Sequence, residues 1–249
     1  MASQSPQAAT EQAHWFATTH WSVVLAAGGE ATPNSANALE QLCGAYWYPL
    51  FAYLRRRGYE AHDAQDLTQS FFVHLLEGNR LGTVSPIKGK FRSFLLSALK
   101  NFLANEFDKT QALKRGVQFS FVPLDTETGE ARFRLEPAHD LTPDRAFEQS
   151  WALALLDTVM KRLRAEHGDP EKARVFDALQ IYLSGDKGVL PYAEMALRLN
   201  LTEGAIKMAV LRLRRRFGEL LRAEISQTVT RPEEVDEEIR CLFAAVTEI

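Results

Sequence analysis

The chain has 249 residues and a formal net charge of -3, and it is 46% hydrophobic and 24% charged. This composition is average for folded globular domains, so it excludes wholesale disorder, and the length favours two small domains. No apolar run approaches the ~20 residues that cross a bilayer. Residues 1–12 lack the basic-then-apolar order of a secretory signal. We therefore expect a cytoplasmic protein that does not enter a membrane.

Apolar residues recur at steps of three and four through most of the sequence, which predicts an all-α fold. Residues 1–38 are expected to be a leader with a short helix. Three amphipathic helices follow over about 39–57, 62–77 and 91–109, separated by glycine-containing turns. These three helices predict one compact bundle, a first domain of residues 39–115.

The periodicity fails over residues 116–145, where prolines and a glycine interrupt a mostly acidic stretch. We interpret this stretch as an interdomain linker. A second helical domain is expected over residues 146–225, and residues 226–249 form an acidic C-terminal extension that contains one amphipathic helix. The apolar side of this extra helix is predicted to carry four residues, Ile239, Leu242, Phe243 and Val246. One expectation is that the helix simply packs on its own chain. The other is that it docks on its own chain or on a regulator and shields the basic helix-turn-helix.

Two short helices in the second domain have the spacing of a helix-turn-helix. The first covers about residues 191–200, and Thr202 is well placed to cap the second. The outward side of the second helix would enter the major groove, with base edges near its start and phosphates near its later cations. The alternative is an ordinary helical hairpin with a solvated basic face. The residues expected at DNA are Thr202, Glu203, Gly204, Lys207, Met208, Leu211, Arg212 and Arg215.

Positive charge is gathered in two stretches although the whole chain is acidic. One stretch lies within residues 88–115 and the other within residues 207–216. Acidic segments between and after them would oppose binding to free DNA, because affinity depends on how many phosphates are neutralised. The pattern is typical of a subunit that binds DNA as part of a larger assembly.

Three segments, in order, resemble the motifs of extracytoplasmic-function sigma factors of bacterial RNA polymerase. Residues 63–72 (DAQDLTQSFF) resemble the segment that grips the polymerase clamp helices, and residues 91–101 (FRSFLLSALKN) the helix that opens the minus-ten element. Residues 192–207, with the arginine-rich stretch after them, are similar to the helix-turn-helix that reads the minus-thirty-five element. The resemblance implies a sigma factor that binds core RNA polymerase and promoter DNA, recognises promoter elements and promotes their opening. An anti-sigma factor or another regulator is a further partner it allows.

The resemblance also implies roles for individual residues, although helix capping and core packing account equally well for some of them. The candidates for polymerase binding are Asp63, Asp66, Leu67, Gln69 and Phe72. The candidates for holding the separated minus-ten strand, by cations, amides or an aromatic ring, are Arg92, Phe94, Lys100, Asn101, Asn105 and Lys109. The chain departs from many relatives at Met208-Ala209, where a small polar residue and an arginine are common. One DNA contact is therefore missing, and the promoter sequence cannot be inferred.

Other classes of function fit less well. A stand-alone helix-turn-helix regulator, which binds duplex DNA without polymerase, leaves the motif at residues 63–72 unexplained. The six histidines form no HExxH motif, no serine lies in a triad signature, and no Walker-type loop occurs, so we expect no enzyme. Cys43 and Cys241 have no metal-ligand spacing, so no metal, cofactor or disulfide is expected.

Overall fold

The structure is a computed structural model. It describes residues 21–28, 33–77, 81, 84–85, 89–112, 126–135, 141–183 and 190–247. These residues contain helices and turns and no strand, so the predicted all-α class is confirmed. Within the same ranges, no helix combines the length and the apolar character needed to cross a bilayer.

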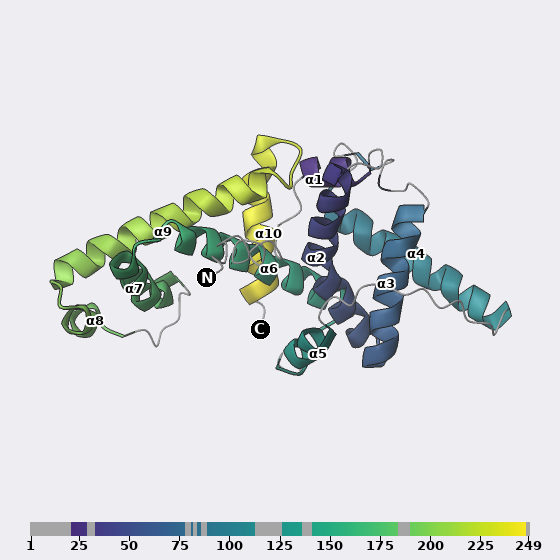
Figure 1. Ribbon diagram of the computed structural model, residues 1–249, viewed down its shortest axis with the longest axis horizontal. Helices are drawn as coiled ribbons and strands as arrows, with labels where there is room; N and C mark the ends of the chain where they lie inside the picture. The colour runs from purple at the N-terminus through teal and green to yellow at the C-terminus, as the bar shows by residue number, and fades with distance from the viewer. Residues whose placement is uncertain are drawn as a thin grey trace, which may run out of the picture. The chain divides into compact units, whose positions relative to one another are not determined.

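The helices largely follow the sequence periodicity, although α2 begins earlier than expected and contains Pro49 in its interior. An internal proline removes one helical hydrogen bond, which the packing of α2 tolerates here. Figure 1 labels the elements along the chain. Their bounds are α1 Trp21–Ala27, α2 Pro33–Arg56, α3 Ala61–Glu77, α4 Phe91–Ala112, α5 Thr126–Leu135, α6 Pro143–Ala165, α7 Pro170–Leu179, the 3-10 turn η4 Gln180–Leu183, α8 Tyr192–Leu199, α9 Glu203–Ser226, the 3-10 turn η5 Pro232–Glu234 and α10 Val235–Thr247.

The chain divides into two compact units. The first contains residues up to Leu155 together with Ile225–Ile249, and the second contains Leu156–Glu224. The division therefore falls inside α6 and near the end of α9, whereas the sequence predicted it over residues 116–145. A continuous helix carries no proline or glycine signal at such a division, which is why composition did not indicate it.

An aromatic core holds the first unit together. The ring of Tyr46 in α2 meets the edge of Phe91 in α4 and stacks on Phe147 in α6, at centroid distances of 5.5 and 6.3 Å. Phe71 of α3 packs against Phe102 of α4 at 5.6 Å. All five rings are buried, and burying a side chain of this size contributes about 1.5–3 kcal/mol relative to exposure. These contacts fix α3 and α4, which carry two of the candidate motifs.

Helix α5 lies where the sequence predicted only linker. Its Gly129 packs so closely on Trp47 of α2 that a Cβ there would lie 2.6 Å from the indole ring. The Arg55 guanidinium donates to the Glu130 carboxylate at 3.1 and 3.2 Å and lies over the ring of Phe133. Because α5 is short and contains a glycine, its stability comes from these contacts with α2 more than from its own helical pattern.

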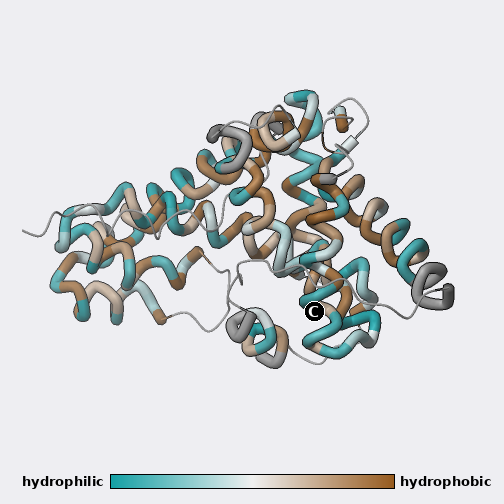
Figure 2. Tube along the Cα trace, turned by 45° about the vertical axis from the view of Figure 1, so that its right-hand side comes forward, coloured by the Kyte–Doolittle hydropathy of each residue, from teal (hydrophilic) through white to brown (hydrophobic). Residues whose placement is uncertain are grey.

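The second unit is built around α9, with α7 and α8 beside it in Figure 1. Its buried side chains include Phe176, Met195 and Val210, from three different helices. The Arg214 guanidinium of α9 donates to the Tyr182 carbonyl of η4 at 2.9 and 3.2 Å. Figure 2 shows apolar and polar residues alternating along the helices, as amphipathic helices require.

Candidate nucleic-acid interface

The turn between α8 and α9 has the geometry of a tight helix-turn-helix connection. Asn200 follows α8 in the left-handed conformation, at a φ of 54°, and the Leu201 N–H donates to the Ala196 carbonyl at 2.9 Å. Asparagine is one of the few residues with a side chain that tolerate this conformation at a helix end. The Thr202 hydroxyl accepts from the Ala205 N–H at 3.2 Å. Thr202 is thus the N-cap that the sequence predicted.

Helix α9 has one buried and one exposed side near its start. Ile206, Val210 and Leu213 are buried, and Phe217 is half-buried. The spacing of these four residues matches one face of a helix, which leaves the opposite face to solvent. The candidate DNA contacts on that exposed face are Glu203, Gly204, Lys207, Met208, Leu211, Arg212 and Arg215, and the cap Thr202 is exposed as well.

The cations on this face differ in their partners. Lys207 forms an ion pair with Glu203 one turn earlier, at 2.7 Å, and this carboxylate raises the pKa of Lys207. Arg215 pairs with Glu219 at 3.1 Å. Within the described residues Arg212 has no ion-pair partner and is exposed. Pairs between exposed neighbours on one helix are weak, so all three cations can reach a phosphate at small cost.

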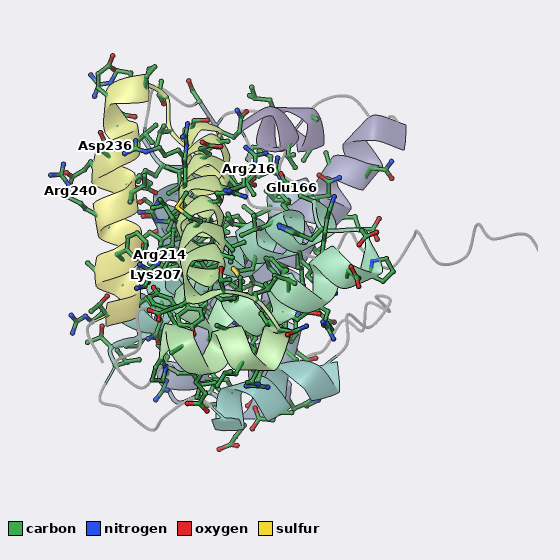
Figure 3. The ribbon with its side chains drawn as sticks, turned by 90° about the vertical axis from the view of Figure 1, so that its left-hand side faces the viewer. Glu166, Lys207, Arg214, Arg216, Asp236 and Arg240 are labelled. Carbon is green, nitrogen blue, oxygen red and sulfur yellow. The ribbon has the colours of Figure 1, made fainter. Side chains whose placement is uncertain are left out.

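Two other arginines of α9 form hydrogen bonds within the second unit. Arg214 donates hydrogen bonds to η4, as described above, and Arg216 donates hydrogen bonds to Glu166, the residue that follows α6. Figure 3 shows Arg214 and Lys207 along α9, with Arg216 beside Glu166. The arginine-rich stretch is therefore divided between internal contacts and the exposed face.

The polymerase-binding candidates on α3 separate into exposed and buried residues. Asp63 and Asp66 are exposed in the first turns of the helix, and Asp66 lies 3.5 Å from His62. Leu67 and Gln69 are half-buried. Phe72 is buried against Phe71 and is 5% exposed, so its assignment as a contact residue is corrected to core packing. The aspartates carry negative charge where it complements the positive end of the helix dipole.

The strand-binding candidates on α4 separate in the same way. Asn101 and Asn105 are exposed one turn apart, so they share a face. Lys100 is exposed and forms an ion pair with Asp144 of α6. Phe94 is half-buried beside Phe91, with ring centroids 5.9 Å apart. Lys109 lies in the helix, but its side chain is outside the described part of the structure.

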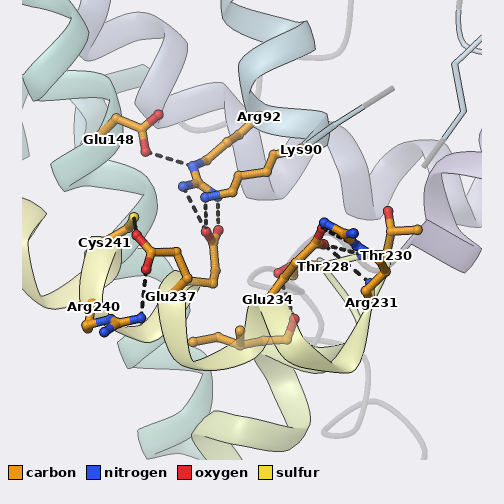
Figure 4. Close-up of polar contacts among 12 residues, drawn as sticks. Lys90, Arg92, Glu148, Thr228, Thr230, Arg231, Glu234, Glu237, Arg240 and Cys241 are labelled. Atoms are coloured by element: carbon orange, nitrogen blue, oxygen red, sulfur yellow. Dashed lines mark hydrogen bonds and ion pairs between the residues drawn. The ribbon is translucent and has the colours of Figure 1, made fainter. Parts of the chain in front are cut away.

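Arg92, a candidate for the minus-ten strand, does not lie on the exposed face of α4 and contacts carboxylates of the chain itself. It is 6% exposed, and its Nε donates to the Glu148 carboxylate of α6 at 2.7 Å. Its two terminal nitrogens donate to the two oxygens of Glu238 in α10. The guanidinium also lies 4.1 Å from the centre of the Trp151 ring. Figure 4 shows the dashed contact between Arg92 and Glu148, with Lys90 beside Arg92.

Lys90, just before α4, completes this buried cluster by pairing with the same Glu238 carboxylate. Burial, and then the neighbouring Arg92 guanidinium, lower the pKa of Lys90 despite the ion pair. Sequence reasoning missed both Glu148 and Glu238 as partners of these cations. A signal for Glu238 was present, because it lies three residues after Val235 and four before Leu242, on the apolar side of α10.

The described residues contain no group of three or more histidine, cysteine, aspartate or glutamate side chains arranged to hold a metal ion. Comparisons with protein-family models, with curated proteins and with solved structures find no match.

Proposed function

We propose that the chain is an alternative sigma factor of the extracytoplasmic-function type, which binds core RNA polymerase in the cytoplasm, recognises promoter elements and promotes DNA opening. The observation that carries the proposal is the pairing of two different exposed surfaces. One is the acidic start of α3 together with the amide face of α4. The other is the cationic face of α9 in a helix-turn-helix.

Each surface fits a separate step of promoter recognition. The exposed Asp63 and Asp66 suit a basic surface on a protein partner, because opposite charges speed and orient association. Asn101 and Asn105 offer amide groups that hydrogen-bond unstacked bases. Lys207, Arg212 and Arg215 lie along one face of α9, where cations near the start of a recognition helix reach phosphates and guanine edges.

The test is transcription by purified core RNA polymerase free of sigma factors, on a library of promoter fragments, followed by sequencing of the transcripts. We expect defined start sites only when this protein is present. Asp66→Arg should abolish them, because it reverses charge on the surface proposed for polymerase. The matched control is Glu171→Arg, which reverses an exposed charge in the first turn of α7, and it should leave the start sites unchanged.

Two results would contradict the proposal. Equal loss of transcripts with Asp66→Arg and Glu171→Arg would mean that the α3 surface has no special role. Absence of transcripts, together with tight binding of the purified protein to duplex DNA, would favour the stand-alone regulator. In that case Arg212→Ala should weaken duplex binding whether or not polymerase is present.

A further inference from the structure

The start of α4 contains a ready-made anion site that is filled by the chain's own C-terminal helix. Lys90 and Arg92 both point at one carboxylate, that of Glu238, whose side chain is fully buried. Trp151 covers one side of the guanidinium and Glu148 holds its Nε. The two remaining guanidinium nitrogens form a planar fork, which fits a carboxylate and a phosphate equally well.

Glu238 would be an unusual residue at a buried position of a helix whose only role is to complete the core. The inner face of α10 consists of Val235, Glu238 and Leu242, all buried. A carboxylate between two apolar side chains has to lose its water, and an apolar residue of similar size often gives equal or greater stability. Because the contact of α10 with α4 is an ion pair, another anion can replace the Glu238 carboxylate.

The apolar part of the contact is small. Phe243, expected on the apolar side of the helix, is 45% exposed, and Ile239 and Val246 are only half-buried. Cys241 is half-buried as well. Val235 and Leu242 are thus the buried apolar residues of α10, and the ion pairs of Glu238 with Lys90 and Arg92 provide much of what holds the helix. Dissociation of α10 needs little apolar surface to be exposed.

We propose that α10 is an internal competitor for nucleic acid: in the free protein Glu238 takes the place of a backbone phosphate between Lys90 and Arg92, and α10 leaves this site when α4 binds a DNA strand. The proposal rests on the proposed function, because it takes α4 as the strand-binding helix. Release of α10 frees Lys90, just before α4, and Arg92 in its first turn, in addition to the exposed Lys100 further along the helix.

Substitution of Glu238 by glutamine tests the competition, because glutamine keeps the shape of the side chain and removes its charge. The probe is a short fluorescent single-stranded oligonucleotide, and binding by the full-length protein is measured by anisotropy at several salt concentrations. Coupling between two sites usually changes affinity by a factor of about 5 to 150. We expect Glu238→Gln to bind on the order of tenfold more tightly than the wild type. Each recovered cation should steepen the slope of log affinity against log salt by about 0.7.

The matched control is Glu237→Gln, which removes one negative charge from the neighbouring residue of the same helix. Glu237 is exposed and pairs with Arg240 at 2.8 Å. Its replacement should leave the affinity close to that of the wild type. Equal gains with both variants would mean that only the general charge of the helix matters, which would overturn the proposal.

Hydrogen exchange of the wild type provides a measurement that needs no variant. Amides of residues 235–247 should exchange faster when the protein is saturated with the oligonucleotide, since α10 then leaves α4. If Glu238→Gln fails to fold, as judged by circular dichroism, this measurement decides alone. Unchanged protection of α10 in the complex would refute the competition.

Transcription with core polymerase separates this proposal from the proposed function. If the wild type directs initiation but Glu238→Gln folds and shows unchanged affinity for the oligonucleotide, the competition fails and the sigma function stands. If initiation is absent but Glu238→Gln alone gains affinity, the competition between Glu238 and nucleic acid stands and the sigma function fails.

Discussion

Arg216 and Glu166 are joined by parallel hydrogen bonds, with the guanidinium Nε and Nη2 donating to the two carboxylate oxygens at 2.9 and 2.7 Å. The pair links α9 to the turn that follows α6, within the second unit. The hydrogen bonds and the charge of Arg216 lower the pKa of Glu166. A carboxylate with a lowered folded-state pKa contributes stability above its unfolded pKa, and this contribution disappears as the pH falls through the folded value.

Glu166→Gln should therefore lower the free energy of unfolding at neutral pH and have a shrinking effect under acid conditions. The difference from the wild type should begin to fall near the ordinary glutamate pKa of about 4.3. Urea unfolding at a series of pH values measures this difference. In an Arg216→Ala background the substitution should have almost no effect at any pH, and a full effect there would show that Arg216 is not the cause.

Gly129→Ala and Gly218→Ala should change stability in opposite directions, although both replace a glycine within a helix. A Cβ at Gly129 would lie 2.6 and 2.8 Å from atoms of the Trp47 ring, whereas a Cβ at Gly218 meets nothing within 4 Å. Overpacking of this kind costs about 1–3 kcal/mol of stability. Replacing an uncrowded helical glycine with alanine gains about 0.5–1 kcal/mol of stability. Thermal unfolding compares the two variants. A stabilised Gly129→Ala would mean that α5 does not pack on Trp47.

The cap of α9 depends on one hydroxyl group. Thr202→Ala should reduce the stability of the second unit by about 0.5–2 kcal/mol, because the Ala205 N–H loses its acceptor. Thr202→Ser keeps the hydroxyl and should stay close to the wild type. Hydrogen exchange over residues 203–208 locates the effect, and equal losses in both variants would point to the lost methyl group instead of the cap.

Cys43 should be nearly inert in the folded protein. Burial, with a smaller effect from Glu40, raises the pKa of its thiol to about 12. Because only the thiolate reacts, the reactive fraction at pH 8 falls by about a thousandfold relative to an ordinary thiol. Alkylation of a Cys241→Ser variant, followed by mass spectrometry, should show slow labelling that becomes fast in denaturant. Fast labelling of the folded variant would contradict the raised pKa of the Cys43 thiol.

The fold class and most helices could be predicted because their apolar residues recur regularly. α3 and α4 begin within a residue of their expected starts, and Thr202 caps α9. Helix α5 could not be predicted, since its position is set by contacts with Trp47 and Arg55 of a distant segment. Propensity alone does not reveal such stabilisation.

The exposure of the candidate residues could be predicted from the sequence only in part. Periodicity indicated the outward face of α9, because buried residues there repeat at helical spacing. Phe72 and Arg92 were assigned to surfaces although both are buried. A single helix pattern does not show which residues a later helix will cover. For Arg92 the covering residues include Glu238, which lies 146 positions further along the chain.

The ion pairs between Arg92, Lys90 and Glu238 also affect how the protein should be shortened. A fragment that ends after α9 removes the acidic residues of α10 and leaves two cations of the first unit without their shared carboxylate. Such a fragment should be retained more strongly on heparin and be more prone to carry nucleic acid through purification. Trimming the C-terminal extension therefore changes the charge that α4 presents, as well as the length of the chain.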